Sequence, residues 1–223
     1  PGLRPIAGVV ESWEYKDPTT LVLNIRKGVK FHDIAPVNGR EMVASDIKFT
    51  LERIQNTVGA GQAIKIKDLV SITIIDEYTL ELKTRVPVAS LLDHLGGVYF
   101  EILAPEVQAK FGDFVREESI IGVGPFQLLE YDPGNLLVYE RHPNYYDPDR
   151  PHVDRVQYIN IPSSQTQTQD AAFRTGQLDI MRDISPSRYG NLSETNPDAF
   201  YQIWVGGNAP QALAFQVNDR PFN

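Results

Sequence analysis

Residues 122–146 read GVGPFQLLEYDPGNLLVYERHPNYY, and this stretch carries the clearest secondary-structure pattern in the chain. Its two halves, 126–131 and 136–141, are rich in the aliphatic and aromatic residues that favour strands. The tetrapeptide Asp-Pro-Gly-Asn at 132–135 separates them. Proline at the second position of a turn holds φ at about −65°, and glycine at the third position takes the positive φ of a type II turn. The stretch therefore predicts an antiparallel β-hairpin.

The residues that flank this hairpin bend or end the chain. Gly122, Gly124 and Pro125 predict a bend at which backbone passes close to backbone. Beyond the second strand, the pair Tyr145-Tyr146 supplies two large amphipathic rings for burial. The stretch pairs no nucleophile with a base, so the residues alone favour a structural role.

Composition narrows the classes of function. The 223 residues suffice for one large domain or two small ones, with 42% hydrophobic and 22% charged residues, as in a globular protein. A net charge of −8 and a pI near 5.0 argue against nucleic acid as a partner. The absence of cysteine excludes disulfides and thiolate chemistry. Because the chain starts at Pro-Gly without methionine and stops directly after an apolar stretch, we expect a fragment whose signal segment is not part of this sequence.

The order of the remaining elements indicates a mixed α/β protein with two regions. Before the hairpin, apolar periodicity predicts four strands and a helix at 44–55 capped by Ser45. The strands are expected at 6–15, 21–26, 71–75 and 78–84. After it, strands and helices alternate, which places a domain boundary between residues 121 and 122. These later elements are a strand at 156–161, a helix opened by the capping box 164–167, a strand at 178–180, a helix from Ser185-Pro186, and strands at 201–205 and 212–217.

The sequence offers weak support for catalysis or metal binding. The four histidines fall in separate predicted elements without ligand spacing, and neither a G-x-S-x-G elbow nor a phosphate-binding glycine loop is present. We therefore expect no catalytic residue, cofactor or metal. Aromatic residues could line a binding cleft, although core positions are their default role. These residues are Trp13, Tyr99, Phe126, Tyr145, Tyr146, Trp204 and Phe215.

Five blocks of sequence occur in a characteristic order. They are LNIRKGVKFHD at 23–33, the segment 38–53 that contains NGRE, ASDI and LER, GVGPF at 122–126, RHPNYY at 141–146 and GQLDI at 176–180. Together they resemble family 5 of the bacterial extracellular solute-binding proteins, which includes the oligopeptide- and dipeptide-binding proteins of ABC importers. The resemblance covers nearly the whole chain.

Several positions depart from the usual motifs of that family. Ile34 stands where the family usually has a glycine, so this turn must take another form. Val43 replaces the threonine that usually caps the next helix, which leaves Ser45 as the expected cap. Val123, His142 and Tyr146 stand where the family usually has threonine, asparagine and tryptophan.

The resemblance implies part of a type II periplasmic-binding-protein fold. Residues 1–121 correspond to the small α+β domain inserted in the first lobe, and residues 122–223 to part of its ligand-facing α/β sheet. The second lobe of the same polypeptide lies outside this sequence. Relatives hold solute in the cleft between the lobes, and hinge closure marks the loaded state for the transporter.

The resemblance also implies a ligand, partners and a location. The solute is an oligopeptide or a related small molecule, with nickel complexes, haem and oligosaccharides as alternatives, and the partners are ABC transporter permease subunits. The location is periplasmic or extracellular, with a lipoprotein anchor in Gram-positive-like hosts. A ligand-presenting component of a sensor and a mixed α/β hydrolase remain alternative functions. The expected ligand-binding residues are Asn208, Gln211, Leu213, Phe215, Gln216 and Asn218 of the last strands, with Gly59, Ala60, Gly61 and Gln62 of a flexible loop.

Overall fold

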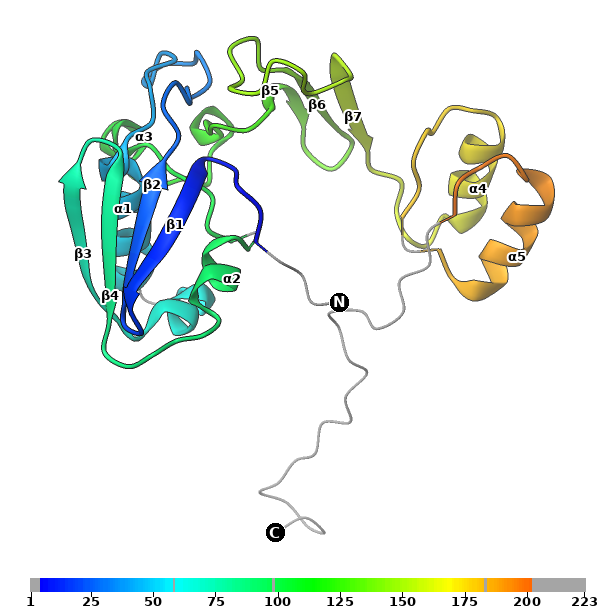
Figure 1. Cartoon of the computed structure of the whole chain (residues 1–223). Coiled ribbons are helices and arrows are strands. Elements are labelled where there is room, and N and C mark those ends of the chain that lie inside the picture. Colours follow the sequence, from blue (N-terminus) through cyan, green and yellow to red (C-terminus); the bar gives the residue numbers. More distant parts are fainter. Residues whose placement is uncertain (1–4, 58, 98, 183, 202–223) are drawn as a thin grey trace, which may run out of the picture. The chain divides into compact units, whose positions relative to one another are not determined.

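Four antiparallel strands form the first sheet of the protein, whose computed structural model describes residues 5–201 except 58, 98 and 183 (Figure 1). The strands lie side by side in the order β1-β2-β4-β3. β1 begins four residues later than expected. Their bounds are Val10–Asp17 for β1, Thr20–Ile25 for β2, Leu69–Asp76 for β3 and Thr79–Thr84 for β4.

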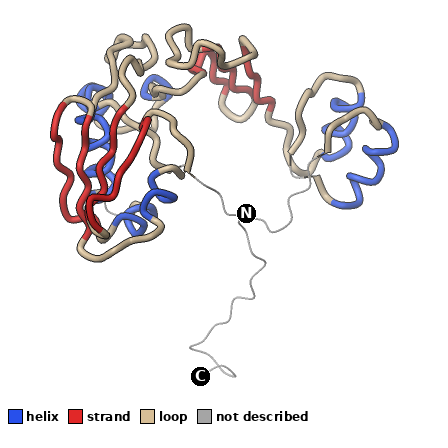
Figure 2. The backbone as a smooth tube through the Cα atoms, in the orientation of Figure 1, coloured by secondary structure: helices blue, strands red, loops and turns tan. Residues whose placement is uncertain are grey.

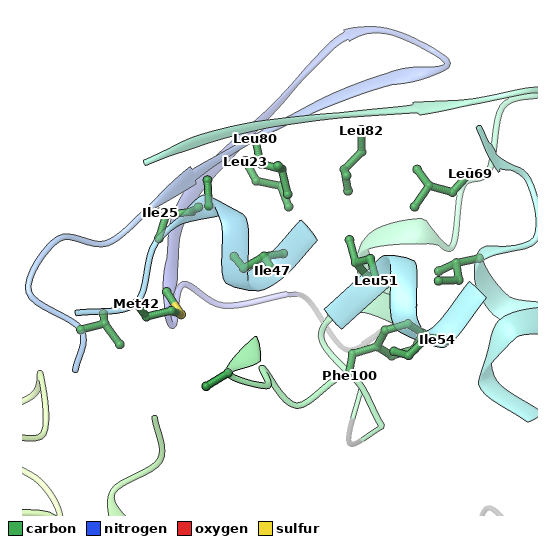
Figure 3. Close-up of a cluster of buried hydrophobic side chains, with 14 of the residues drawn as sticks. Leu23, Ile25, Met42, Ile47, Leu51, Ile54, Leu69, Leu80, Leu82 and Phe100 are labelled. Carbon is green, nitrogen blue, oxygen red and sulfur yellow. The ribbon is translucent and has the colours of Figure 1, made fainter. Parts of the chain in front are cut away.

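One face of this sheet carries the apolar residues of the alternating pattern. Leu21 and Leu23 of β2 pair with Leu82 and Leu80 of β4, so these four side chains share a face. Helix α1 (Ala44–Asn56) covers that face, as Figures 2 and 3 show. The helix buries its apolar stripe there, and each fully buried aliphatic side chain contributes about 1.5–3 kcal/mol. The stripe consists of Ile47, Leu51 and Ile54.

The start of α1 corrects the predicted cap. The helix begins at Ala44, so Val43 is the N-cap and Ser45 lies within the first turn. Valine has no side-chain acceptor, and the carboxylate of Asp46 takes over part of the capping role by accepting the backbone N–H of Val43 at 2.9 Å. The prediction of Ser45 as the cap was wrong because the acidic residue can reach back to the residue before the helix.

Short helices connect the remaining parts of this region, one between α1 and β3 and the others between β4 and the hairpin. Helix α3 begins at Pro105, because proline suits the first helical position, and Gly112 ends the helix with a φ of +83°. The shorter elements are α2 (Leu91–Leu95) and two 3₁₀ helices, η1 (Gly61–Ile66) and η2 (Glu117–Ser119), while α3 spans Pro105–Phe111.

The predicted hairpin forms and gains a third strand. β5 (Phe126–Asp132) pairs antiparallel with β6 (Leu136–Arg141), and β7 (Arg155–Ile159) pairs with the other side of β6. At the turn, the N–H of Asn135 donates to the carbonyl of Asp132 at 3.0 Å, and Gly134 has a φ of +83°. These features confirm the type II turn that the sequence predicts.

The structure divides into two compact units between Asn160 and Ile161. The predicted boundary at 121–122 therefore falls inside the first unit, between its two sheets. As a division between an inserted domain and a ligand-facing lobe, that boundary stays a prediction. No described helix is long and apolar enough to cross a membrane.

The second unit contains two described helices, α4 (Thr166–Arg174) and α5 (Pro186–Thr195). Arg188 of α5 binds Asp170 of α4 in a largely buried ion pair. Ser185 caps α5 as predicted, because its hydroxyl accepts the N–H of Arg188 at 3.4 Å. An ion pair therefore links α4 to α5, and a serine cap stabilises the start of α5.

Two expectations for this unit were wrong. Gln165 rather than Ser164 precedes α4, and no side chain caps that helix. The expected strand at 178–180 is not formed, because the described part of the unit offers no neighbouring strand to pair with its backbone. The strands expected at 201–205 and 212–217 lie, apart from residue 201, outside the described residues.

Candidate functional site

The predicted ligand-binding loop Gly59–Gln62 leads from α1 into the 3₁₀ helix η1. Ala60 is the N-cap residue of η1, and its carbonyl accepts the N–H of Ala63 at 3.0 Å. The other predicted ligand-binding residues lie outside the described part of the chain. They are Asn208, Gln211, Leu213, Phe215, Gln216 and Asn218.

The end of η1 is anchored in the first unit. Ile66 is buried in the hydrophobic core, and the Gln55 side chain of α1 donates to the carbonyl of Leu69 at 2.8 Å. The imidazole Nδ1 of His94 lies 3.1 Å from the carbonyl of Lys65. These contacts hold the end of η1 against α1 and α2, while glycines at 59 and 61 predict flexibility for the loop before it.

Gln62 is the one residue of this loop whose side chain can form hydrogen bonds. Its Oε1 atom is buried and has no hydrogen-bond partner among the residues that the structure describes. A buried carbonyl oxygen without a donor costs about 1–3 kcal/mol, so this atom is a local destabilising feature of the loop.

A second candidate surface is the aromatic groove, which we define as Pro125, Phe126, Leu137, Tyr139, Val156 and Tyr158. The register places Leu137 opposite Tyr158 and Tyr139 opposite Val156, so these side chains share one face of the β5-β6-β7 sheet. A hollow of about 480 Å³ lies over this face. An adjoining hollow of about 500 Å³ shares three of its lining residues and adds Tyr145, Arg150, Pro151, His152 and Val153.

The groove is lined by apolar and aromatic side chains. The rings of Tyr139 and Tyr158 meet edge to face with centroids 5.9 Å apart. Burial raises the pKa of the Tyr139 hydroxyl, which keeps it neutral. Arg150, which lines the adjoining hollow, lies 3.6 Å from the carboxylate of Asp147. Such a surface suits apolar or stacking groups.

Only one residue of this groove, Phe126, was among the aromatic residues that the sequence suggested for a cleft. Tyr145 of the adjoining hollow was also among those residues, whereas Tyr139, Val156 and Tyr158 of the groove were not. The signal that could have found them is the period of two, because alternate residues of β6 and β7 reach the same face.

The structure also brings together two histidines that the sequence analysis assigned to separate elements. His32 follows β2 and His142 follows β6, and their rings lie edge to face with centroids 4.9 Å apart. No group of three or more His, Asp or Glu residues that could hold a metal occurs within the described residues. Their hydrogen bonds run to backbone groups at Gly122 and Gly124.

The family model for bacterial extracellular solute-binding proteins, family 5, middle region, matches residues 4–223. The chain belongs to this family. The family identified from the five sequence blocks is therefore confirmed.

Relatives of this family 5 chain are considerably longer than it is. The peptide transport periplasmic protein SapA of Salmonella typhimurium is 30% identical over 99% of this chain and 42% of its own length. The periplasmic oligopeptide-binding protein OppA of the same species is 24% identical over 82% of this chain and 36% of its own length. The chain thus spans about two fifths of the length of these relatives.

A solved structure confirms the fold class. The ABC transporter-associated periplasmic binding protein DppA of Helicobacter pylori, in complex with the peptide STSA, superposes with a TM-score of 0.73 at 23% identity. The match covers 85% of this chain and 40% of that one. The family 5 chain therefore has a partial, mixed α/β periplasmic-binding-protein fold.

Proposed function

We propose that this chain is part of the first lobe of a solute-binding protein that captures oligopeptides, or a related small solute, and delivers them to an ABC transporter. The match of the family 5 model to residues 4–223 carries this proposal. The names of SapA and OppA, which refer to peptide transport and oligopeptide binding, favour a peptide as the solute. Both names also say periplasmic, which supports a periplasmic or extracellular location. The proposed lipoprotein anchor in Gram-positive-like hosts rests on the family resemblance alone.

The proposed division of labour follows the family resemblance. Residues 1–121 act as the small inserted domain, and residues 122–223 contribute to the ligand-facing lobe. The proposed solute-binding residues are the loop Gly59–Gln62 together with Asn208, Gln211, Leu213, Phe215, Gln216 and Asn218.

The proposed mechanism is capture without chemical change. A peptide binds through its backbone, which permits many side-chain sequences, and the second lobe closes over it. Among the described residues, the hydrogen bonds of His32, His94 and His142 run to backbone groups and not to a hydroxyl. The ion pairs of Arg40 with Asp46 and Glu106, and of Arg188 with Asp170, join helices. The protein is therefore proposed not to be an enzyme.

The test is mass spectrometry of the full-length protein that contains this chain, purified without denaturation and then unfolded to release its ligand. We expect short peptides in the released fraction. Exchange of Gln62→Ala should lower the ligand occupancy, whereas Gln108→Ala, which removes an exposed glutamine from α3, should not. Release of no small molecule, or of a single non-peptide compound, would overturn peptide capture.

The chain alone should bind weakly, because one wall of the cleft belongs to the second lobe. Calorimetry of the 223-residue chain with the released peptides checks this point. Micromolar affinity for the isolated chain would contradict the proposal that both lobes are needed.

A further inference from the structure

Two buried imidazoles connect the two sheets of the first unit. His32 is 4% exposed and lies in the turn after β2, and His142 is 1% exposed and directly follows β6. Both approach the bend at Gly122–Pro125, from which the hairpin begins. We call His32, His142, Gly122 and Gly124 the histidine joint.

The hydrogen bonds of the joint determine which nitrogen of each ring carries the proton. The N–H of Gly122 donates to Nδ1 of His32 at 3.2 Å, so that nitrogen is the bare acceptor. The proton of His32 is then on Nε2, which donates to the carbonyl of Gly124 at 3.2 Å. Nδ1 of His142 lies 3.2 Å from the same carbonyl, which can only accept, so His142 carries its proton on Nδ1.

The fourth nitrogen of the pair is unused. Nε2 of His142 is buried and has no hydrogen-bond partner among the described residues. With these assignments both rings are neutral, and one carbonyl, at Gly124, accepts from both of them through its two lone pairs.

A second proton on either ring conflicts with this arrangement. On His32 it would have to sit on Nδ1, where it would face the N–H of Gly122 and break that hydrogen bond. On His142 it would sit on the buried Nε2, which has no acceptor, and two protonated rings would place like charges about 4.9 Å apart. The joint is therefore compatible only with neutral imidazoles.

The surrounding groups do not relieve this conflict. Neither imidazole bonds to a carboxylate within the part of the chain that the structure describes. The charged neighbours in the chain are Asp33, next to His32, and Arg141, next to His142. The ring of Tyr145 lies 6.5 Å from that of His142, and Arg26 stacks on the adjacent Tyr146. Of these, Asp33 and Arg141 are exposed, and their charges are screened by water.

We propose that the histidine joint is acid-sensitive: it fastens the β5–β6 hairpin to the turn after β2 while both imidazoles are neutral, and releases it when either gains a proton. Two backbone bonds share the same contact and would loosen with it. They run from the N–H of His32 to the carbonyl of Gly122 at 2.9 Å, and from the N–H of His142 to the carbonyl of Pro125 at 2.8 Å.

The direction of the pH dependence follows from the lowered pKa values of the two histidines. Burial lowers the pKa of His32 to about 4, and burial also lowers the pKa of His142. A free imidazole has a pKa of about 6.5, so the unfolded chain binds more protons than the folded chain below that pH. The joint is fully formed above about pH 6.5 and weakens as the pH falls towards 4.

Nuclear magnetic resonance of the 223-residue chain tests the joint directly. Nitrogen shifts of the rings at pH 7 should report the Nε2–H tautomer for His32 and the Nδ1–H tautomer for His142. Hydrogen-exchange protection of the Gly122 amide, corrected for the intrinsic rate, should fall at least tenfold between pH 7 and 4.5. The opposite tautomers, or unchanged protection of this amide, would overturn the proposal.

A matched pair of variants separates the joint from general acid unfolding. His142→Asn keeps a side-chain donor for Gly124 and removes one site of protonation, so release should move to lower pH by about half a unit or more. His152→Asn removes an exposed imidazole from outside the joint and should leave the midpoint unchanged. Equal shifts in both variants would show that the pair has no special role. This outcome is independent of the ligand, so it does not depend on the proposed function.

Discussion

Replacing Arg40 by alanine should be among the most damaging single changes in the first unit. The guanidinium of Arg40 binds Asp46 of α1 through two hydrogen bonds, at 2.7 and 2.9 Å, and binds Glu106 of α3 through two more. It also lies over the ring of Phe31, with its central carbon 4.9 Å from the ring centroid. One side chain thus joins the loop before α1 to the first turns of two helices.

The two carboxylates should contribute unequally. Asp46 is 1% exposed, so Arg40→Ala leaves a buried carboxylate with only the N–H of Val43 as a partner. Removal of one member of a buried ion pair costs about 3–5 kcal/mol, and the remaining bond and the partial exposure of Arg40 reduce this to about 2–4 kcal/mol. The side chain of Glu106 is 37% exposed, and water screens its share to less than about 1 kcal/mol.

Urea unfolding followed by circular dichroism measures this difference. With an m-value of about 1–3 kcal/mol/M, a loss of about 3 kcal/mol moves the midpoint down by about 1 M or more. Glu106→Ala is the control and should lower the free energy of unfolding by less than about 1 kcal/mol. Arg40→Lys should fall between the two, because lysine keeps the positive charge but cannot form two parallel hydrogen bonds with one carboxylate. If Arg40→Ala and Glu106→Ala lower stability equally, the buried position of Asp46 does not decide the energetics, and the reasoning fails.

Two further predictions concern the stability of the same chain in urea. Gly134→Ala should destabilise the chain by about 1–2 kcal/mol, because Gly134 has a φ of +83°. Gly190→Ala should stabilise it by about 0.5–1 kcal/mol, because Gly190 lies inside α5 with open space for a Cβ. Two changes of the same sign would contradict this contrast. Leu80→Ala should lower the free energy of unfolding by about 2–5 kcal/mol, because Leu80 is fully buried. Ile75→Ala, on the exposed part of β3, should lower it by less than about 1 kcal/mol. Similar losses in the two variants would argue against the assigned core.

Local chemistry explains which parts of the fold could be predicted. The turn at Asp132–Asn135 needs only the φ preferences of its own proline and glycine, and the start of α3 at Pro105 is equally local. The apolar alternation in β2 likewise predicted the buried face of the first sheet. The failures lay where a distant or unexpected partner decided the outcome, as at Ser45, where Asp46 reaches back past the expected cap.

By itself, the sequence determined the family, the fold class, the hairpin with its turn, and the apolar stripe of α1. The hairpin and the helix rest on backbone preferences and on periodicity, which act over a few residues, whereas the family and its fold came from the resemblance of five sequence blocks. Only the tertiary structure decided that His32 and His142, which are far apart in the chain, share one carbonyl, and that alternate residues of β6 and β7 form an aromatic groove. The physical reason is that hydrogen-bond partners and shared faces depend on chain packing, and sequence spacing does not record which distant segments meet.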